Sequence, residues 1–327
     1  MVLAWLGSTG VGLMIAGIYT CDIQGRAMQA NDQSKHFGHN FHTPLRYPGG
    51  KGKLARYVAS VMEMNGLCGG TYVEPYAGGA AVAISLLLSG HAKRVHINDL
   101  SREIHAFWRA VLEDPDDLLA RIRDTPVTME NWYRMRDVLN DRSASPLELG
   151  FATFFLNRTN RSGILKGGVI GGKDQTGIWK LDARYNKNDL SRRIHTIADK
   201  RSAIHLHNED ARRLITRLAP KLAKSNLVYL DPPYFKKGQE LYPNFYQPSD
   251  HAQLADSLKA LPSSVRWMLS YDSHPEIAAL YRRFRGFSYT LNYTAQERMR
   301  GHELIFFSRG MRIPDLTGSM QPVTQAA

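Results

Sequence analysis

The strongest constraint in this sequence is a short apolar segment that ends at two consecutive prolines. Leu227-Val228-Tyr229-Leu230 is rich in residues that favour strands, and Asp231-Pro232-Pro233-Tyr234 follows directly. Because proline lacks a backbone N–H and fixes φ, the chain has to leave a sheet at Asp231. The sequence therefore predicts a carboxylate, a proline carbonyl and an aromatic ring at one strand end, where open α/β sheets bind ligands.

These residues suit a planar ligand that carries an amino group. The carboxylate of Asp231 and the carbonyl of Pro232 are both acceptors, so together they can take the two hydrogens of an amine. The ring of Tyr234 offers a flat face for a base. On four residues alone, an ordinary turn after a strand explains the pattern equally well.

Three upstream segments favour a ligand site over an ordinary turn. The segment 71–80 predicts a strand, then Glu74-Pro75-Tyr76, then glycines that open a helix. Glycines let a backbone approach a ligand closely, and a helix N-terminus favours anionic groups. The next predicted strand, 94–99, ends in Asp99 about twenty residues on, the spacing of acids that bind ribose hydroxyls. Arg46-Tyr47-Pro48-Gly49-Gly50-Lys51 precedes them all.

In this order, the segments RYPGGK, VEPYAGG, IND and LDPPY resemble the Dam-type (class alpha) family of DNA adenine methyltransferases, over residues 43–309. The resemblance implies S-adenosylmethionine as cofactor and double-stranded DNA as partner. It implies transfer of a methyl group to the 6-amino group of adenine, with the base flipped out of the duplex. It also implies an α/β fold, a doubly wound Rossmann-like sheet with an inserted, mainly helical target-recognition domain.

The resemblance assigns roles to individual residues. Catalysis falls to Asp231, Pro232, Pro233 and Tyr234, with the tyrosine stacked on the base. Lys51 is expected to face the carboxylate of the cofactor, Asp99 its ribose and Asp210 its adenine. The full set implied to bind the cofactor is Tyr47, Lys51, Glu74, Pro75, Tyr76, Gly78, Asp99, Asp210 and Asp231. The set implied to bind DNA is Asn157, Arg158, Arg161, Ser162, Lys180, Arg184, Tyr185 and Arg192. A solvated loop lysine at 51 and a helix N-cap at 99 are the structural alternatives.

The sequence departs from the family pattern at two positions. Ala211 stands after Asp210 where the family has an aromatic residue, so Tyr76 or another ring has to supply the contact with the cofactor adenine. Arg161 stands where members that methylate GATC have an intercalating tyrosine. Arginine can stack on bases or bind guanine, so a changed specificity is expected. Lys180, Arg184, Arg192 and Arg193 are interpreted as phosphate contacts.

The charge of the chain fits a polyanionic partner. Lys and Arg exceed Asp and Glu by 42 − 30 = 12, and the pI is about 9.7. Residues 151–203 alone hold 11 basic and 4 acidic residues, an excess of 7. A solvated basic surface is the alternative explanation of this excess.

Three classes of site are excluded or disfavoured. Two cysteines are too few for a disulfide framework, which suits a reducing, cytoplasmic compartment. Gly167–Lys173 has P-loop spacing, but Asp174 follows where an NTPase needs Ser or Thr. No metal site is expected, because the histidines at 36, 39 and 42 lie in a polar segment.

The predicted organisation has one large unit with an insertion. Residues 1–42 are expected to be an appendage, disordered or not native, since Met28 begins a chain that holds every motif. The uncharged stretch 1–21 is long enough for a membrane span, although an appendage without membrane contact is favoured. The catalytic domain is placed at 43–112 and 204–312, the target-recognition domain at 113–203 and a tail at 313–327. Helices are expected at 54–64, 80–88, 103–112, 116–140 (two, broken at Thr125-Pro126) and 147–156, and late strands at 265–270, 287–291 and 304–307, the last two as an antiparallel pair.

Two other functions remain open from the sequence. The amine could belong to cytosine, although motifs for the cytosine 4-amino group more often begin with serine. The chain could also be a DNA-binding protein that holds the cofactor without turnover, which intact LDPPY and glycine segments disfavour. A cognate restriction enzyme is a possible partner that the sequence leaves undetermined.

Overall fold

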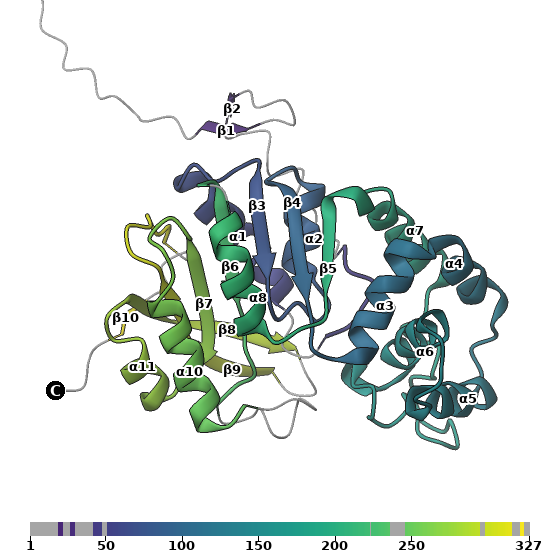
Figure 1. Cartoon of the computed structure of the whole chain (residues 1–327). Helices are drawn as coiled ribbons and strands as arrows, with labels where there is room; N and C mark the ends of the chain where they lie inside the picture. The colour runs from purple at the N-terminus through teal and green to yellow at the C-terminus, as the bar shows by residue number, and fades with distance from the viewer. Residues whose placement is uncertain are drawn as a thin grey trace, which may run out of the picture.

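The computed structural model describes residues 19–21, 27–29, 42–47, 51–222, 224–235, 246–294, 298–315 and 321–323. Its centre is an eight-stranded sheet in the order β10-β8-β9-β7-β6-β3-β4-β5 (Figure 1). The strands are β3 (Gly70–Glu74), β4 (Ala92–Asn98), β5 (Ile204–His207), β6 (Asn226–Leu230), β7 (Trp267–Asp272), β8 (Arg285–Thr294), β9 (Arg298–Phe307) and β10 (Gln321–Pro322).

Strands β5, β4, β3, β6 and β7 pair in parallel, and β9 joins antiparallel between β7 and β8. The expected doubly wound sheet with a closing antiparallel hairpin is thus confirmed. The strand order reverses between β3 and β6, where Val73 pairs with Val228. The turns after Glu74 and Leu230 therefore leave the sheet side by side, at the switch point where such sheets bind ligands.

Helices cover both faces of the sheet, as the alternation of its side chains requires. Tyr72 of β3 belongs to the apolar core with α1 (Ala55–Met64), α2 (Ala81–Leu88) and α3 (Arg102–Glu113). The next residue, Val73, belongs to the core with α8 (Ala211–Leu218), α10 (Pro248–Lys259) and α11 (Pro275–Leu280). All five residues of β6 are buried, which agrees with an apolar run covered on both sides.

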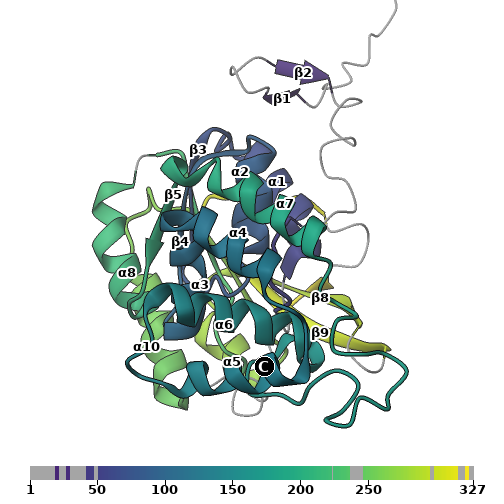
Figure 2. The same ribbon diagram turned by 90° about the vertical axis from the view of Figure 1, so that its right-hand side faces the viewer.

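A helical unit lies beyond the β5 edge of the sheet and faces the viewer in Figure 2. It consists of α4 (Pro115–Asp124), α5 (Met129–Asn140), α6 (Pro146–Thr159) and α7 (Lys187–Ala198). The predicted break at Thr125-Pro126 is confirmed between α4 and α5. Helix α6 begins with a capping box of Ser145 and Glu148 and packs closely on α3, where a Cβ at Gly150 would lie 2.5 Å from the carbonyl oxygen of Ala106. The limits of the recognition domain stay a prediction.

The two ends of the chain are described only in part. A short antiparallel pair, β1 (Tyr19–Cys21) and β2 (Ala27–Gln29), forms a separate sheet. The rest of the expected appendage, except His42, lies outside the described residues, as does the candidate span at 1–21 apart from β1. Among the residues that the structure covers, no helix has the length and apolar character to cross a membrane. Residues 321–322 of the expected tail pair with Phe287 and Ser288 as β10.

Candidate active site

The carboxyl end of β6 brings Asp231 together with two residues that are distant in the sequence. The Nζ atom of Lys51 lies 3.3 Å from Oδ1 of Asp231 and 3.0 Å from Oε1 of Glu303. Lys51 comes from the 3-10 turn η2 (Lys51–Leu54), and Glu303 comes from β9. The side chains of Lys51 and Glu303 are 3% and 2% exposed, whereas that of Asp231 is 19% exposed. A buried cation therefore stands between two carboxylates, and Asp231 is the one that reaches the surface.

The hydroxyl of Tyr234 is fixed by the same group. It accepts a hydrogen bond from Lys51 Nζ at 2.6 Å and donates one to Glu303 Oε1 at 2.6 Å. The Lys51 ammonium also lies 5.0 Å from the centroid of the Tyr234 ring. These contacts hold the ring beside Asp231, and its stacking on a base stays a prediction.

The two oxygens of Asp231 have different surroundings. Oδ1 accepts a hydrogen bond from the Ser270 hydroxyl at 2.7 Å, and this hydroxyl is 2.8 Å from that of Tyr229. Both polar contacts that the described residues make with this carboxylate fall on Oδ1. Within the described part of the chain, no hydrogen bond reaches the carbonyl of Pro232 either. Oδ2 of Asp231 and the Pro232 carbonyl are thus two acceptors with capacity for a donor ligand.

Burial and charge set the protonation states at this site. Burial raises the pKa of Asp231 to about 6; Lys51 lowers it, Glu303 raises it and the Ser270 hydrogen bond lowers it. Burial alone would lower the pKa of Lys51, but the charges of Asp231 and Glu303 raise it above its usual value. Lys51 is therefore a cation, and Asp231 is mostly ionised at neutral pH. In this structure the charge of Lys51 pairs with two protein carboxylates, and the expectation that it faces the cofactor carboxylate stays a prediction.

The glycine turn after β3 is built around Gly78. Its φ is +47°, and a Cβ there would lie 2.7 Å from the ring of Tyr47, so only glycine fits. The Gly78 N–H donates to Asp99 Oδ2 at 2.9 Å, and the Ser101 N–H donates to Asp99 Oδ1 at 2.8 Å. Ser101 is itself the N-cap of α3, so the N-cap alternative for Asp99 is wrong. Burial raises the pKa of Asp99 to about 6 against these hydrogen bonds.

Two residues assigned to the cofactor instead hold the turn together. Glu74 is buried, and its Oε2 accepts the N–H of Ala83 in the first turn of α2 at 3.0 Å. The carbonyl of Pro75 accepts from Asn98 Nδ2 at 2.8 Å. Asn98 also bonds to both backbone polar groups of Glu209, which joins this turn to the loop before α8. Glu74 and Pro75 thus support the turn, and their direct contact with a cofactor stays a prediction.

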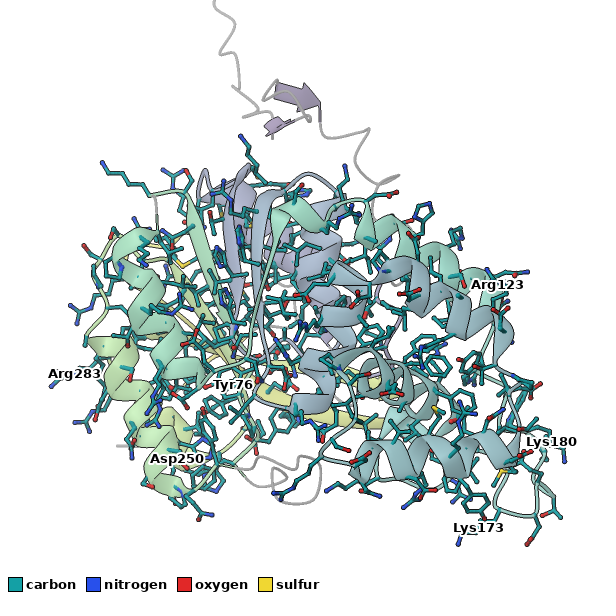
Figure 3. The ribbon with its side chains drawn as sticks, turned by 45° about the vertical axis from the view of Figure 1, so that its right-hand side comes forward. Tyr76, Arg123, Lys173, Lys180, Asp250 and Arg283 are labelled. Carbon is teal, nitrogen blue, oxygen red and sulfur yellow. The ribbon has the colours of Figure 1, made fainter. Side chains whose placement is uncertain are left out.

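Asp210 and Tyr76 both lie near the ring of Tyr246. Asp210 is the N-cap of α8 and accepts from the N–H groups of Arg212 and Arg213 at 3.1 and 3.2 Å. The hydroxyls of Tyr76 and Tyr246 are 2.7 Å apart, and their ring centroids are 6.1 Å apart in an edge arrangement. Burial and the charge of Asp210 contribute to raising the pKa of Tyr246 to about 12. Tyr246 is therefore a ring near Asp210, where Ala211 has none; Figure 3 shows Tyr76 at the end of the strands.

The comparison with protein families decides the identity of this site. The model of the D12 class N6 adenine-specific DNA methyltransferase family matches residues 47–295, a span that runs from Tyr47 past the LDPPY segment. The chain belongs to this family. It is an S-adenosylmethionine-dependent enzyme that methylates adenine in DNA. The expected family, activity and cofactor are thus confirmed.

Solved structures similar to the methyltransferase are distant. An rRNA methyltransferase of Streptomyces viridochromogenes is 16% identical, covers 85% of this chain and 92% of its own, and has a TM-score of 0.36. A SAM-dependent methyltransferase from Agrobacterium tumefaciens is 10% identical, covers 89% of this chain and 76% of its own, and has a TM-score of 0.39. No curated protein sequence matches the chain. In the described residues, no group of three or more His, Cys, Asp or Glu could hold a metal ion.

Two residues that the sequence assigned to DNA, Asn157 and Tyr185, are buried in the methyltransferase. Asn157 is 1% exposed; its Oδ1 accepts the Arg46 N–H, and its Nδ2 donates to the carbonyls of Arg46 and Gly163. Tyr185 packs against the rings of Phe154 and Phe155, with centroids 5.4 Å apart in both pairs. The DNA assignments of Asn157 and Tyr185 are corrected, because neither side chain is accessible to DNA.

Arg158 also serves the protein backbone. Its Nε donates to the Arg184 carbonyl at 2.7 Å, and one terminal nitrogen donates to the Pro44 carbonyl at 3.4 Å. Burial, with the neighbouring charges of Arg46 and Arg193, lowers the pKa of Arg158 to about 10. The half-buried Arg158 thus joins three segments of the protein, and its contact with DNA stays a prediction.

The other residues assigned to DNA are exposed, and their roles stay predictions. Arg161, Ser162, Lys180, Arg184 and Arg192 all reach solvent. Arg192 forms an exposed ion pair with Asp189 at 2.5 Å, which an approaching phosphate can replace at little cost. In Figure 3, Lys173 and Lys180 lie at the outer end of the helical unit, on the side toward which the sheet strands run.

An apolar pair in this basic segment was missed by the sequence analysis. Ile178 and Trp179 are 94% and 65% exposed, and the guanidinium of Arg184 lies 5.8 Å from the Trp179 ring. The side chain of Gln175 braces the loop, because it donates to the carbonyls of Ile170 and Gly172 and accepts from the N–H of Leu181. The only signal in the sequence is an apolar pair among glycines and lysines, a pattern equally typical of a small core.

Proposed function

We propose that this methyltransferase acts on adenines in a specific DNA sequence and binds the flipped base between Asp231 and Tyr234. The observation that carries the proposal is the arrangement at the end of β6. An ionised carboxylate and a carbonyl that both have acceptor capacity lie beside a ring that Lys51 and Glu303 hold in place. Asp231 is also the exposed member of the charged group, so a ligand can reach it.

The chemistry of an aromatic amine explains this choice of residues. The lone pair of the adenine amine is delocalised into the ring, so the nitrogen is a weak nucleophile. Hydrogen bonds from its two hydrogens to Asp231 Oδ2 and to the Pro232 carbonyl increase the electron density on nitrogen. The nitrogen loses a proton as it gains the methyl group, and the Asp231 carboxylate is the base in contact with it. In-line placement of the two reactants supplies much of the remaining rate enhancement.

The residues around the glycine turn fit S-adenosylmethionine. When bound, this cofactor supplies a methyl group on a positively charged sulfur. Gly78 keeps the backbone open beside Tyr47, and the Asp99 carboxylate accepts one N–H on each oxygen, so it retains lone pairs for ribose hydroxyls. Tyr76 and Tyr246 offer ring surface near Asp210 for the cofactor adenine, in place of the aromatic residue absent at Ala211.

The exposed basic residues of 161–192 suit the phosphates of a duplex, and they position DNA without specifying its sequence. A base inside a duplex cannot reach Asp231, so the proposal includes flipping, whose cost other contacts have to offset. Ile178 and Trp179 provide apolar surface for unstacked bases at the same loop. A nucleoid location in the cytoplasm and a cognate restriction enzyme are proposals that follow only from the DNA substrate.

The proposed chemistry is tested by identifying the modified nucleoside. The enzyme is incubated with plasmid DNA and S-adenosylmethionine labelled on the methyl group, and the DNA is then digested to nucleosides. We expect the label in N6-methyldeoxyadenosine. Label in N4-methyldeoxycytidine would contradict the adenine assignment of Asp231, and cofactor binding without any labelled nucleoside would identify a non-catalytic protein. Mapping the modified adenines then gives the recognition sequence.

A further inference from the structure

Glu303 is a buried carboxylate that the proposed reaction does not use directly. It lies on β9, where the strand pairing sets it opposite Asp272 of β7 and Tyr289 of β8. Its Oε1 accepts from Lys51 Nζ at 3.0 Å and from the Tyr234 hydroxyl at 2.6 Å, and its Oε2 accepts from the Tyr289 hydroxyl. Three donors from three separate parts of the chain therefore converge on one side chain.

The charge balance makes this carboxylate unexpected on grounds of stability. Lys51 alone would neutralise Asp231, and a second carboxylate leaves one cation against two anions in a buried site. Taking charges out of water is costly, and a buried ion pair is weak evidence for stability because apolar residues often replace it without loss. Two of the three donors to Glu303, Lys51 and Tyr234, also lie beside the proposed adenine site. A functional role explains the arrangement better than a contribution to folding.

We propose that Glu303 is a positioning residue, which holds the Lys51 ammonium and the Tyr234 hydroxyl so that Asp231 and the Tyr234 ring are preset for the base. The inference rests on the proposed role of Asp231 and Tyr234 as the binders of adenine. With Glu303 present, Lys51 divides its hydrogen bonds between two carboxylates and Tyr234. Asp231 therefore keeps Oδ2 for the amine, and the ring cannot turn away.

Removal of the Glu303 charge has two consequences. Lys51 then pairs with Asp231 without competition from a second carboxylate, so Asp231 becomes a weaker acceptor for the amine. The Tyr234 hydroxyl loses an acceptor, so its ring is less well held. Both changes act on the bound base and not on the cofactor turn at Gly78. We therefore expect a lower rate of methyl transfer with little change in cofactor affinity.

The pH dependence separates positioning from a merely structural role. Among the causes that set the pKa of Asp231, the negative charge of Glu303 raises it. Glu303→Gln should therefore lower this pKa and move the acidic limb of the rate profile to lower pH. Loss of folded protein would reduce the rate without moving the limb. Among the described residues, Tyr234 lies beside Asp231, and the groups whose charges interact with it are Lys51, Tyr72, Glu74, Tyr229, Tyr271, Tyr289 and Glu303.

The experiment measures single-turnover methyl transfer to plasmid DNA across pH for the parent, Glu303→Gln and Glu303→Asp. Glu303→Gln should slow transfer on the order of a hundredfold, the scale of a small misplacement of reacting groups, with its acidic limb at lower pH. Glu303→Asp retains the charge on a shorter side chain. Its methyl transfer should therefore be slow, and the acidic limb of its pH profile should stay at the pH of the parent. The affinity for labelled S-adenosylmethionine should stay within a few-fold of the parent.

Two further variants keep the test decisive. Tyr289→Phe removes one donor to Glu303 and preserves the ring, so the variant should fold. Its rate of methyl transfer should fall several-fold, with the acidic limb of the pH profile unchanged. Glu63→Gln is the matched control. Glu63 of α1 also pairs with a buried partner, His91 at 2.8 Å, but this pair lies outside the site. The inference is overturned by parent-like transfer in Glu303→Gln, or by a slow variant whose limb does not move. If Glu303→Gln does not fold, parent-like transfer in Tyr289→Phe overturns it. Transfer within a few-fold of the parent in Asp231→Asn would instead refute the proposed function itself.

Discussion

At the scale of single residues, the two oxygens of Asp231 differ in their contacts. Ser270 and Lys51 both contact Oδ1, and Oδ2 keeps its acceptor capacity. Lys51 and Tyr234 have different roles: the lysine keeps the carboxylate ionised, and the tyrosine presents a flat ring. A neutral or displaced side chain at position 231 would lose the acceptor function even though the fold remained.

The pKa of Asp231 gives a prediction for the parent enzyme. Burial raises this pKa to about 6, and only the ionised form accepts both a hydrogen bond and a proton from the amine. The single-turnover rate should therefore be constant above neutral pH and fall as pH decreases through about 6. Measured rates that stay constant well below this value, with DNA binding intact, would exclude ionised Asp231 as the acceptor.

At the scale of elements, the site is formed where β3 and β6 leave the sheet next to each other. Glu74 ends β3 and accepts the N–H of Ala83, so it fixes the start of α2 relative to the sheet. Asn98, the last residue of β4, donates to the Pro75 carbonyl and accepts the Glu209 N–H. It therefore fixes the turn after β3 relative to the loop before α8. The loop geometry around Gly78 is thus a consequence of buried hydrogen bonds between neighbouring elements.

Glu74 gives a prediction on stability. Burial raises its pKa to about 8 from an ordinary value of 4.5, against the Ala83 hydrogen bond. The folded state then holds a proton that the unfolded state releases, so this carboxyl lowers stability as pH rises from 4.5 toward 8. Glu74→Gln keeps a neutral acceptor for Ala83 and should flatten that decrease. Denaturant unfolding of both proteins at several pH values checks this; an equally steep decrease in the variant would contradict it.

The sequence predicted elements better than contacts. Apolar runs such as 227–230 and the proline break near Pro126 depend on local chemistry, so their positions were confirmed. Asn157 was misassigned because residue type does not tell whether an amide faces DNA or the backbone of Arg46. Helix α6 is buried nearly all round, so no polar face marked its direction. The role of Glu303 could not be predicted from the sequence. One partner, Tyr289, is set by the pairing of β8 with β9, and another, Lys51, lies in a turn more than two hundred residues away.

At the scale of the whole molecule, the helical unit and the strand ends open toward the same side (Figure 3). In the proposed function, a duplex whose phosphates contact Lys180 presents a base to Asp231. The buried residues Asn157 and Tyr185 and the half-buried Arg158 hold the segment between α6 and α7 through contacts within the protein. The side chains that we propose as DNA contacts in this segment are different ones, and they are exposed.

Two substitutions in this loop separate phosphate contacts from base contacts. Lys180→Ala should weaken binding about equally on all sequences and reduce the salt slope by about one. Arg161→Ala should lower selectivity between cognate and one-base-altered duplexes by about 1–3 kcal/mol. Methylation of both duplexes at two salt concentrations distinguishes the effects. If Arg161→Ala lowers affinity equally on both duplexes, Arg161 is one more phosphate contact.

In the proposed mechanism, the Asp231 carboxylate promotes methyl transfer to the adenine amine. Its most direct test is the single-turnover rate of Asp231→Asn, a change that preserves size and one acceptor but removes the charge, measured together with cofactor affinity and thermal unfolding. We expect Asp231→Asn to transfer the methyl group at least about a hundredfold more slowly than the parent, the scale of one lost electrostatic contact. Its cofactor affinity and fold should be retained. Transfer within a few-fold of the parent would contradict the proposed mechanism.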